Sequence, residues 1–134
     1  MTTLIKVRGY HLDVYQHVNN ARYLEFLEEA RWEWLDRSGV ADWLIQQHLG
    51  FIAVNININY RRAAKLGDCL EVTCQMAEIS ERSAVMEQKV THSGEGTLVA
   101  DARITFVCLD LKQQKSVPVS GEIKTFLERI NQQA

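Results

Sequence analysis

The stretch ARYLEFLEEARWEWLDR, residues 21–37, decides the fold. Its apolar residues recur at the spacing of one helix face: Tyr23, Leu27, Ala30 and Trp34. Asn19 or Asn20 is expected to cap the start of this helix, and Gly39 to end it. Trp32 interrupts the polar face, so the apolar coverage is wider than a helix on a protein surface requires. We therefore expect a sheet or a partner to surround this helix.

The segments around this helix predict that sheet. A short strand is expected at residues 4–9 and a short helix at 41–48. Four strand-like runs follow at residues 52–60, 69–79, 83–92 and 98–111, and Ser120 can cap a last helix. In the first run, apolar residues alternate strictly with Ala53, Asn55, Asn57 and Asn59. Short links at 66–68, 80–82 and 93–96 predict antiparallel neighbours. The sequence thus predicts an α+β fold, a curved antiparallel sheet wrapped around one long central helix, in a single domain of residues 1–134.

Composition excludes several classes of protein. Fifteen Lys and Arg against 17 Asp and Glu give a net charge of −2, which argues against a nucleic-acid-binding module. No apolar run approaches the ~18–20 residues that span a bilayer, and the first eight residues do not resemble a secretory signal. The cysteines, Cys69, Cys74 and Cys108, are odd in number and form no CxxC motif. Free thiols in a reducing compartment, the cytoplasm, are therefore expected.

The densest cluster of reactive side chains is residues 10–20, directly before the long helix. Asp13 is the only acidic residue ahead of Glu25. At a helix N-terminus, unpaired backbone N–H groups can stabilise a developing oxyanion. A carboxylate on the preceding loop can then activate water or attack a carbonyl directly. The alternative is that Asp13, His17 and the two asparagines only cap the helix and order the loop.

Other chemistries are less well supported. His11, Asp13 and His17 are metal-ligand types, but their spacing is not that of an established metal site, so no metal is expected. No Gly-x-Ser-x-Gly elbow and no phosphate-binding glycine loop occurs. Arg61, Arg62 and Lys65 form the strongest basic cluster. They either hold the phosphates of an anionic ligand or form a solvated strand end.

The loop and helix together resemble a known family. The pattern Asp13-x-x-x-His17-Val18-Asn19-Asn20-x-x-Tyr23-x-x-x-x-Glu28-x-x-Arg31 resembles the opening motif of hotdog-fold acyl-CoA thioesterases of the 4-hydroxybenzoyl-CoA thioesterase superfamily. Residues 5–10 through Trp32, 55–62 and 105–108 look like the bacterial long-chain acyl-CoA thioesterases within it. The resemblance runs from residue 3 to the last helix.

The resemblance implies a hotdog fold that dimerises by joining two sheets edge to edge, as a homodimer or homotetramer with sites at subunit interfaces. It implies an acyl-CoA substrate, no cofactor, and Asp13 as the catalytic carboxylate, either general base or nucleophile. The carbonyl-polarising N–H falls near Asn20, with His17 and Asn19 ordering the loop. Tyr23 and the basic cluster Arg61, Arg62 and Lys65 are then the candidate substrate-binding residues.

Two departures from the family pattern leave alternatives open. Val14, Tyr15 and Gln16 replace the small Pro-Ala-Gly stretch of some relatives, so a preference for aromatic substrates does not carry over. An assisting carboxylate on the helix remains open, because Glu25, Glu28 and Glu29 are all present. The alternatives to an acyl-CoA thioesterase are a thioesterase acting on acyl-carrier-protein thioesters, a non-catalytic acyl-CoA-binding hotdog module, and a hotdog hydratase.

Overall fold

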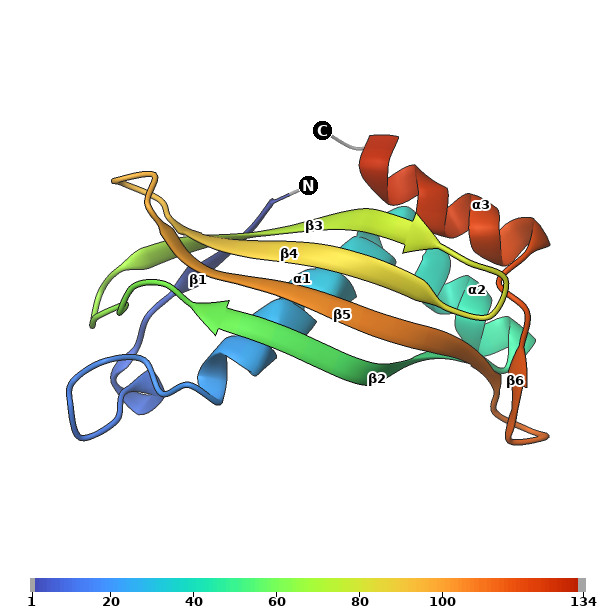
Figure 1. The fold of residues 1–134 in the computed structure, drawn as a ribbon, viewed down its shortest axis with the longest axis horizontal. Coiled ribbons are helices and arrows are strands. Elements are labelled where there is room, and N and C mark those ends of the chain that lie inside the picture. Colours follow the sequence, from blue (N-terminus) through green and yellow to red (C-terminus); the bar gives the residue numbers. More distant parts are fainter. Residues whose placement is uncertain (1, 133–134) are drawn as a thin grey trace.

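The computed structural model describes residues 2–132 as a six-stranded sheet with helices on one face (Figure 1). The strands are β1 (Thr2–Lys6), β2 (Leu49–Tyr60), β3 (Cys69–Ile79), β4 (Ala84–His92), β5 (Leu98–Asp110) and β6 (Lys115–Val117). The helices are α1 (Arg22–Ser38), α2 (Val40–Gln47) and α3 (Gly121–Arg129), with short 3-10 turns at Gly9–His11 and Ile130–Gln132. The long helix α1 crosses behind the sheet, which curves around it. The α+β hotdog prediction is confirmed.

The strand order is β1-β3-β4-β5-β2, with every pair antiparallel and β6 added to the end of β5. The short link between β2 and β3 predicts that these two strands pair, and this prediction is wrong. In the sheet, β3 lies between β1 and β4, and β2 lies at the opposite edge beside β5. Strand β1 occupies the free side of β3, and β2 pairs with β5. Both β1 and β2 are therefore edge strands, with one side unpaired.

The core lies between α1 and the inner face of the sheet. Trp34, Leu27 and Leu70 are among its largest fully buried side chains. Gln88 is also fully buried: its Nε2 donates to the carbonyl O of Leu27 at 3.0 Å, and its Oε1 accepts from Arg31 Nη1 at 2.9 Å. This satisfied polar pair fixes the position of the helix along the sheet, because buried polar groups are costly when unpaired.

The cap at the start of α1 differs from the prediction, and the cap at its end agrees with it. Gly39 ends the helix as expected, in the left-handed conformation at φ 77°. At the start, the N-cap is Ala21 rather than Asn19 or Asn20. The reason is that Asn19 Oδ1 accepts from the backbone N–H of Ala21, at 2.9 Å, and so closes a turn one residue before the helix begins.

Strand β2 carries a bulge that interrupts its alternation. Its register with β5 shifts between Ala53 and Asn55, so Val54 has no partner. Ile56 then lies opposite the buried Ile104, whereas Ile52 lies opposite Val107 on the outer face. The predicted strict alternation over 52–60 is therefore wrong at Val54.

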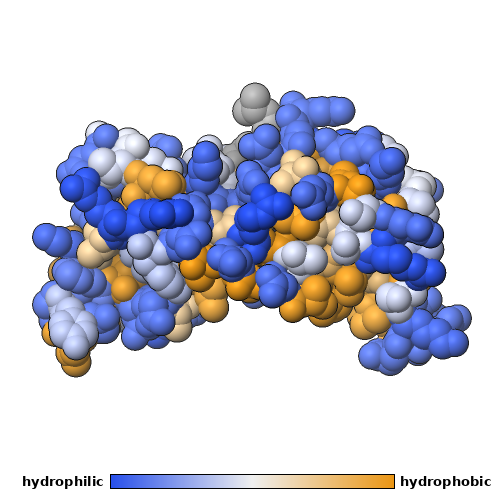
Figure 2. All heavy atoms as spheres, in the orientation of Figure 1, coloured by the Kyte–Doolittle hydropathy of each residue, from blue (hydrophilic) through white to orange (hydrophobic). Residues whose placement is uncertain are grey.

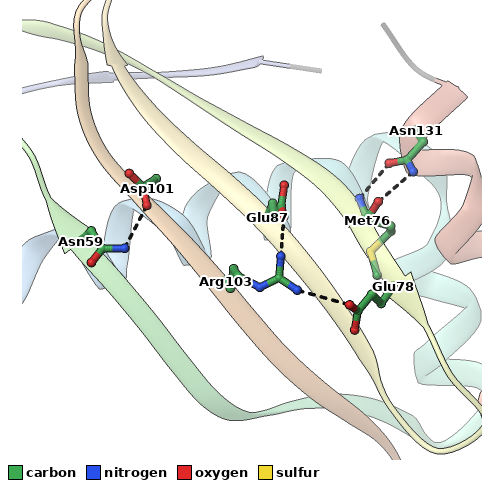
Figure 3. A network of polar contacts seen from close by, with 7 residues as sticks. All are labelled: Asn59, Met76, Glu78, Glu87, Asp101, Arg103 and Asn131. Carbon is green, nitrogen blue, oxygen red and sulfur yellow. Dashed lines mark hydrogen bonds and ion pairs between the residues drawn. The ribbon is translucent and has the colours of Figure 1, made fainter.

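The outer face of the sheet is mainly hydrophilic, with hydrophobic residues gathered along the middle of the lower margin, the side on which β2 runs (Figure 2). Arg103 on β5 forms ion pairs with Glu87 on β4 and with Glu78 on β3 (Figure 3).

Beyond the end of β1, the side chain of Asn131 makes the hydrogen bonds to β3 that a neighbouring strand would make. It bonds both the N–H and the C=O of Met76. None of the helices within residues 2–132 is long and apolar enough to cross a membrane.

Candidate active site

A groove of about 340 Å³ lies where the loop before α1 meets the end of β2. It is lined by Asp13, His17, Val18, Asn20, Tyr23, Tyr60, Arg61, Arg62 and Ala63. Six of the predicted site residues thus meet in one place although they come from segments forty residues apart. The other two, Asn19 and Lys65, are not among the lining residues.

The loop that carries Asp13 is a short hairpin. Leu12 and Val18 form a β-bridge, and the backbone N–H of Asp13 donates to the carbonyl O of His17 at 2.9 Å. The N–H of Tyr15 donates to Asp13 Oδ1 at 2.8 Å and so fixes the carboxylate. Within residues 2–132, Oδ2 accepts no hydrogen bond, and Asp13 is one of the residues that line the groove. Asp13 is thus a held carboxylate with one oxygen available for chemistry.

The hairpin is fastened to the chain that follows β2. The N–H of Val18 donates to the carbonyl O of Ala64 at 2.9 Å, and both residues are buried. The backbone N–H groups of Arg61 and Arg62 both donate to the carbonyl O of Val99, at 2.8 and 3.1 Å. The segment that crosses from β2 to β3 therefore serves as the floor of the site.

In the chain from residue 2 to 132, one backbone N–H just before α1, that of Asn20, is left unpaired at a residue that lines this groove. The N–H of Ala21 is taken by Asn19 Oδ1 and that of Arg22 by the carbonyl O of Asn19. The N–H of Asn20 has no hydrogen-bond partner among the described residues. With the positive end of the helix dipole beside it, this N–H is suited to an oxyanion or a polarised carbonyl.

Two tyrosines wall the groove. Tyr23 is buried, at 3% exposure, and burial raises the pKa of its phenol, so it remains neutral. Tyr60 packs edge-to-face on Tyr23, with the ring centroids 5.4 Å apart. From the sequence alone, Tyr60 is predicted only to end a strand, and no role in the site is assigned to it. Its hydroxyl donates to the carbonyl O of Asn20 at 2.9 Å. The available signal was its position on β2, immediately before the arginines.

Arg61 and Arg62, the two arginines of the basic cluster, differ in whether a carboxylate pairs with them. Arg61 Nε donates to Asp101 Oδ2 at 2.7 Å. This bond raises the pKa of Arg61 and, with help from Asn59, lowers the pKa of Asp101 (Figure 3 shows Asn59 and Asp101). In the described part of the chain, no carboxylate forms an ion pair with Arg62. Arg62 is therefore better placed than Arg61 to take an anionic ligand.

The helix glutamates do not line this groove. Glu25 and Glu29 line a second groove, of about 410 Å³, between α1 and β1, together with Glu33, Lys6 and His11. Glu28 accepts instead from the indole N–H of Trp32 at 3.2 Å, and Trp32 is half exposed. Within one chain, Asp13 is the carboxylate of the first groove.

His11, Asp13 and His17, whose side chains are of metal-binding types, do not form a metal site. His11 Nδ1 accepts from the backbone N–H of Arg8 at 2.8 Å, and burial, with Arg22 nearby, lowers its pKa. Over residues 2–132, no three His, Cys, Asp or Glu side chains are grouped so as to hold a metal ion. What the site offers is a carboxylate, a polarising N–H and a cation.

Comparison with known proteins finds thioesterases that match most of the chain. Long-chain acyl-CoA thioesterase FadM of Escherichia coli strain K12 is 55% identical over 130 residues, 97% of this chain and 98% of the relative. Acyl-CoA thioesterase YbgC of Haemophilus influenzae is 31% identical over 109 residues, 80% of this chain and 79% of the relative. The crystal structure of YbaW, a probable thioesterase from Escherichia coli, superposes with a TM-score of 0.91 at 55% identity, covering 97% of this chain and 98% of that one.

The family assignment rests on almost the whole chain. The model of the thioesterase-like superfamily matches residues 7–127, which include the hairpin, α1, the whole sheet except β1, and most of α3. The chain therefore belongs to the thioesterase-like superfamily.

Proposed function

We propose that this enzyme hydrolyses long-chain acyl-CoA to a free fatty acid and CoA. The observation that carries the proposal is the pairing of Asp13, with one unbonded carboxylate oxygen, and the unbonded N–H of Asn20 in one groove. Acyl-CoA thioester hydrolysis is the activity named for relatives that match over most of the chain. The long acyl chain comes from the relative at 55% identity.

In the proposed reaction, the thioester carbonyl oxygen accepts from the Asn20 N–H, which stabilises the oxyanion that forms. Asp13 either takes a proton from water as the water attacks the carbonyl carbon, or attacks that carbon itself to give an anhydride that water then opens. In both routes the C–S bond breaks and CoA leaves as the thiolate, which takes up the proton that Asp13 received from water in the first route and a proton from solvent water in the second. His17 and Asn19 order the loop, and Tyr23 contacts the acyl group.

The CoA moiety is proposed to lie across the basic side of the groove. Its phosphates match the exposed guanidinium of Arg62, with Arg61 and Lys65 nearby along the chain. Ordinary charge attraction at an exposed site is weak and screened by salt, so these contacts should affect KM more than kcat.

We also propose that β2 joins two copies of the chain into a dimer, or two such dimers into a tetramer. The 12-residue strand has one unpaired side and exposes Ile52, Val54 and Ile56 at 39%, 57% and 38%. An exposed apolar edge of this length is otherwise prone to unwanted pairing. Because Tyr60 ends this strand and Arg61 follows it directly, the groove then lies next to the interface.

The remaining proposals concern the cell compartment, the extent of the domain and the need for a cofactor. The three cysteines are free thiols, which fits a cytoplasmic enzyme. Residues 1–134 are proposed to work as one hotdog domain without a cofactor, since the groove already supplies the groups that the reaction needs.

The test is release of free thiol from acyl-CoAs of short, long and aromatic acyl groups, by wild type and Asp13→Asn together. We expect release that increases with chain length and is lost in the variant. Release by both proteins would remove Asp13 from the mechanism. No release from any CoA ester, but release from acyl-carrier-protein thioesters, would identify the carrier protein as the substrate. Tight binding without release from either would indicate a binding module.

A further inference from the structure

The peptide unit that joins Asn20 to Ala21 is held at both ends. Its carbonyl O accepts from Tyr60 Oη at 2.9 Å, and its N–H donates to Asn19 Oδ1, also at 2.9 Å. One of these bonds comes from a residue beside it in the chain and the other from a strand forty residues away. This peptide is directly next to the one that carries the Asn20 N–H.

The peptide that carries the Asn20 N–H has one bond of its own, because its carbonyl O, that of Asn19, accepts from the N–H of Arg22 at 2.9 Å. Asn20 is exposed, and Ala21, the N-cap of α1, has no side chain that can accept from the helix. A loop-to-helix junction without such a cap is free to fray at its first residues. A polarising N–H is effective only if its direction is fixed before the reaction begins. The two bonds to the next peptide add to the bond from Arg22 and complete that restraint.

Tyr60 is itself well fixed for this role. It lies opposite the buried Ala100, on the inner face of β2. Its ring packs on buried Tyr23, and the next two backbone N–H groups both bond Val99. Its hydroxyl proton is already committed to the carbonyl O of Asn20, so the hydroxyl is not acting as a free acid toward the groove.

We propose that Tyr60 is a positioning residue for thioester hydrolysis: with Asn19, it clamps the Asn20–Ala21 peptide and so aims the Asn20 N–H at the substrate carbonyl. The inference rests on the proposed function for its kinetic consequence but not for the clamp itself. It also ties the edge strand β2 to the oxyanion site, because the clamping side chain belongs to that strand.

The first test is Tyr60→Phe, which removes the hydroxyl and keeps the ring. One neutral hydrogen bond contributes modestly, so we expect kcat to fall about three- to tenfold while KM stays within about twofold. Tyr10→Phe is the matched control, because Tyr10 is 72% exposed and lies outside the groove of Asp13. An unchanged kcat, or a rise in KM alone, in Tyr60→Phe overturns the proposal.

The second test combines Tyr60→Phe with Asn19→Ala. If both side chains hold one peptide, either loss releases it, and the second loss costs less. We therefore expect the double variant to lose less in kcat than the product of the two single losses. A loss equal to the product, or larger, shows that the two residues act separately and contradicts the clamp. Unchanged melting temperatures confirm that each variant is folded.

The third measurement needs no activity. Exchange of the Ala21 amide proton with water, followed by NMR, should be slow in wild type and in Tyr10→Phe and faster in Tyr60→Phe and Asn19→Ala. If wild type hydrolyses no thioester but this exchange difference is found, the proposed function fails and the clamp stands. If wild type is active but exchange at Ala21 is the same in all four proteins, the clamp fails alone.

Discussion

The two edges of the sheet each carry a groove, and the grooves differ in charge more than in size. The groove at the end of β2 has Arg61 and Arg62 with the single carboxylate of Asp13. The groove beside β1 has three glutamates and one lysine. A thioester of CoA brings several phosphate charges, which the second groove would repel. The larger of the two grooves is thus not the better site for CoA, because its negative charge is of the same sign as that of the phosphates.

The strongest test of this contrast makes the same isosteric change in both grooves. Asp13→Asn keeps the size of the side chain but removes the base or nucleophile, so kcat should fall by about a thousandfold. Glu29→Gln, in the groove beside β1, should change kcat by less than about twofold. Steady-state thiol release measures both. A comparable loss in Glu29→Gln would mean that the two grooves act together.

A second test compares the two edge strands. Ile56→Lys places a charge on the exposed apolar edge of β2, and by symmetry on both copies, so the proposed dimer should weaken by about a hundredfold or more. Leu4→Lys is the control on β1, where Leu4 is 64% exposed. Sedimentation velocity gives the oligomeric state, and thiol release shows whether activity follows it. If both variants remain dimers, the dimer interface does not lie on the edge of β2.

A third test asks which arginine meets the phosphates. Arg62→Gln should raise KM about three- to tenfold, with kcat nearly unchanged, and the remaining KM should depend less on salt. The same change at Arg82, in the link between β3 and β4, should leave KM as it is. The proposal for Arg62 fails if KM and its salt dependence match wild type.

The smallest effect concerns the ion pair behind the groove. Because Arg61 lowers the pKa of Asp101, the pair stabilises the folded protein at neutral pH. That contribution is lost as the pH falls through the lowered pKa. Carboxyl NMR titration should show the lowered value in wild type and a return toward the ordinary aspartate value in Arg61→Gln. An identical titration curve in both would show that Arg61 does not hold Asp101 in solution.

Local patterns predicted the elements well because their causes are local. The bounds of β3 agree with the prediction, α1 differs by one residue at each end, and Asp13 emerged from a polar cluster ahead of a helix. The contacts at the site that the sequence did not predict join distant residues. The ion pair of Arg61 with Asp101 and the bond of Tyr60 to Asn20 each span forty residues. Neither the alternation of β2 nor its link to β3 revealed them.

The bulge at Val54 has a consequence for how this protein tolerates changes in length. One unpaired residue reverses which side chains of β2 face inward, and every position from Asn55 to Tyr60 inherits that reversal. Deleting Val54 would remove the bulge and leave a regular strand in which Tyr60 still faces inward, because the partners of Ala53 and Asn55, Phe106 and Thr105, are consecutive residues of β5. Of all positions in β2, Val54 is therefore the one at which the loss of a residue should disturb the groove least.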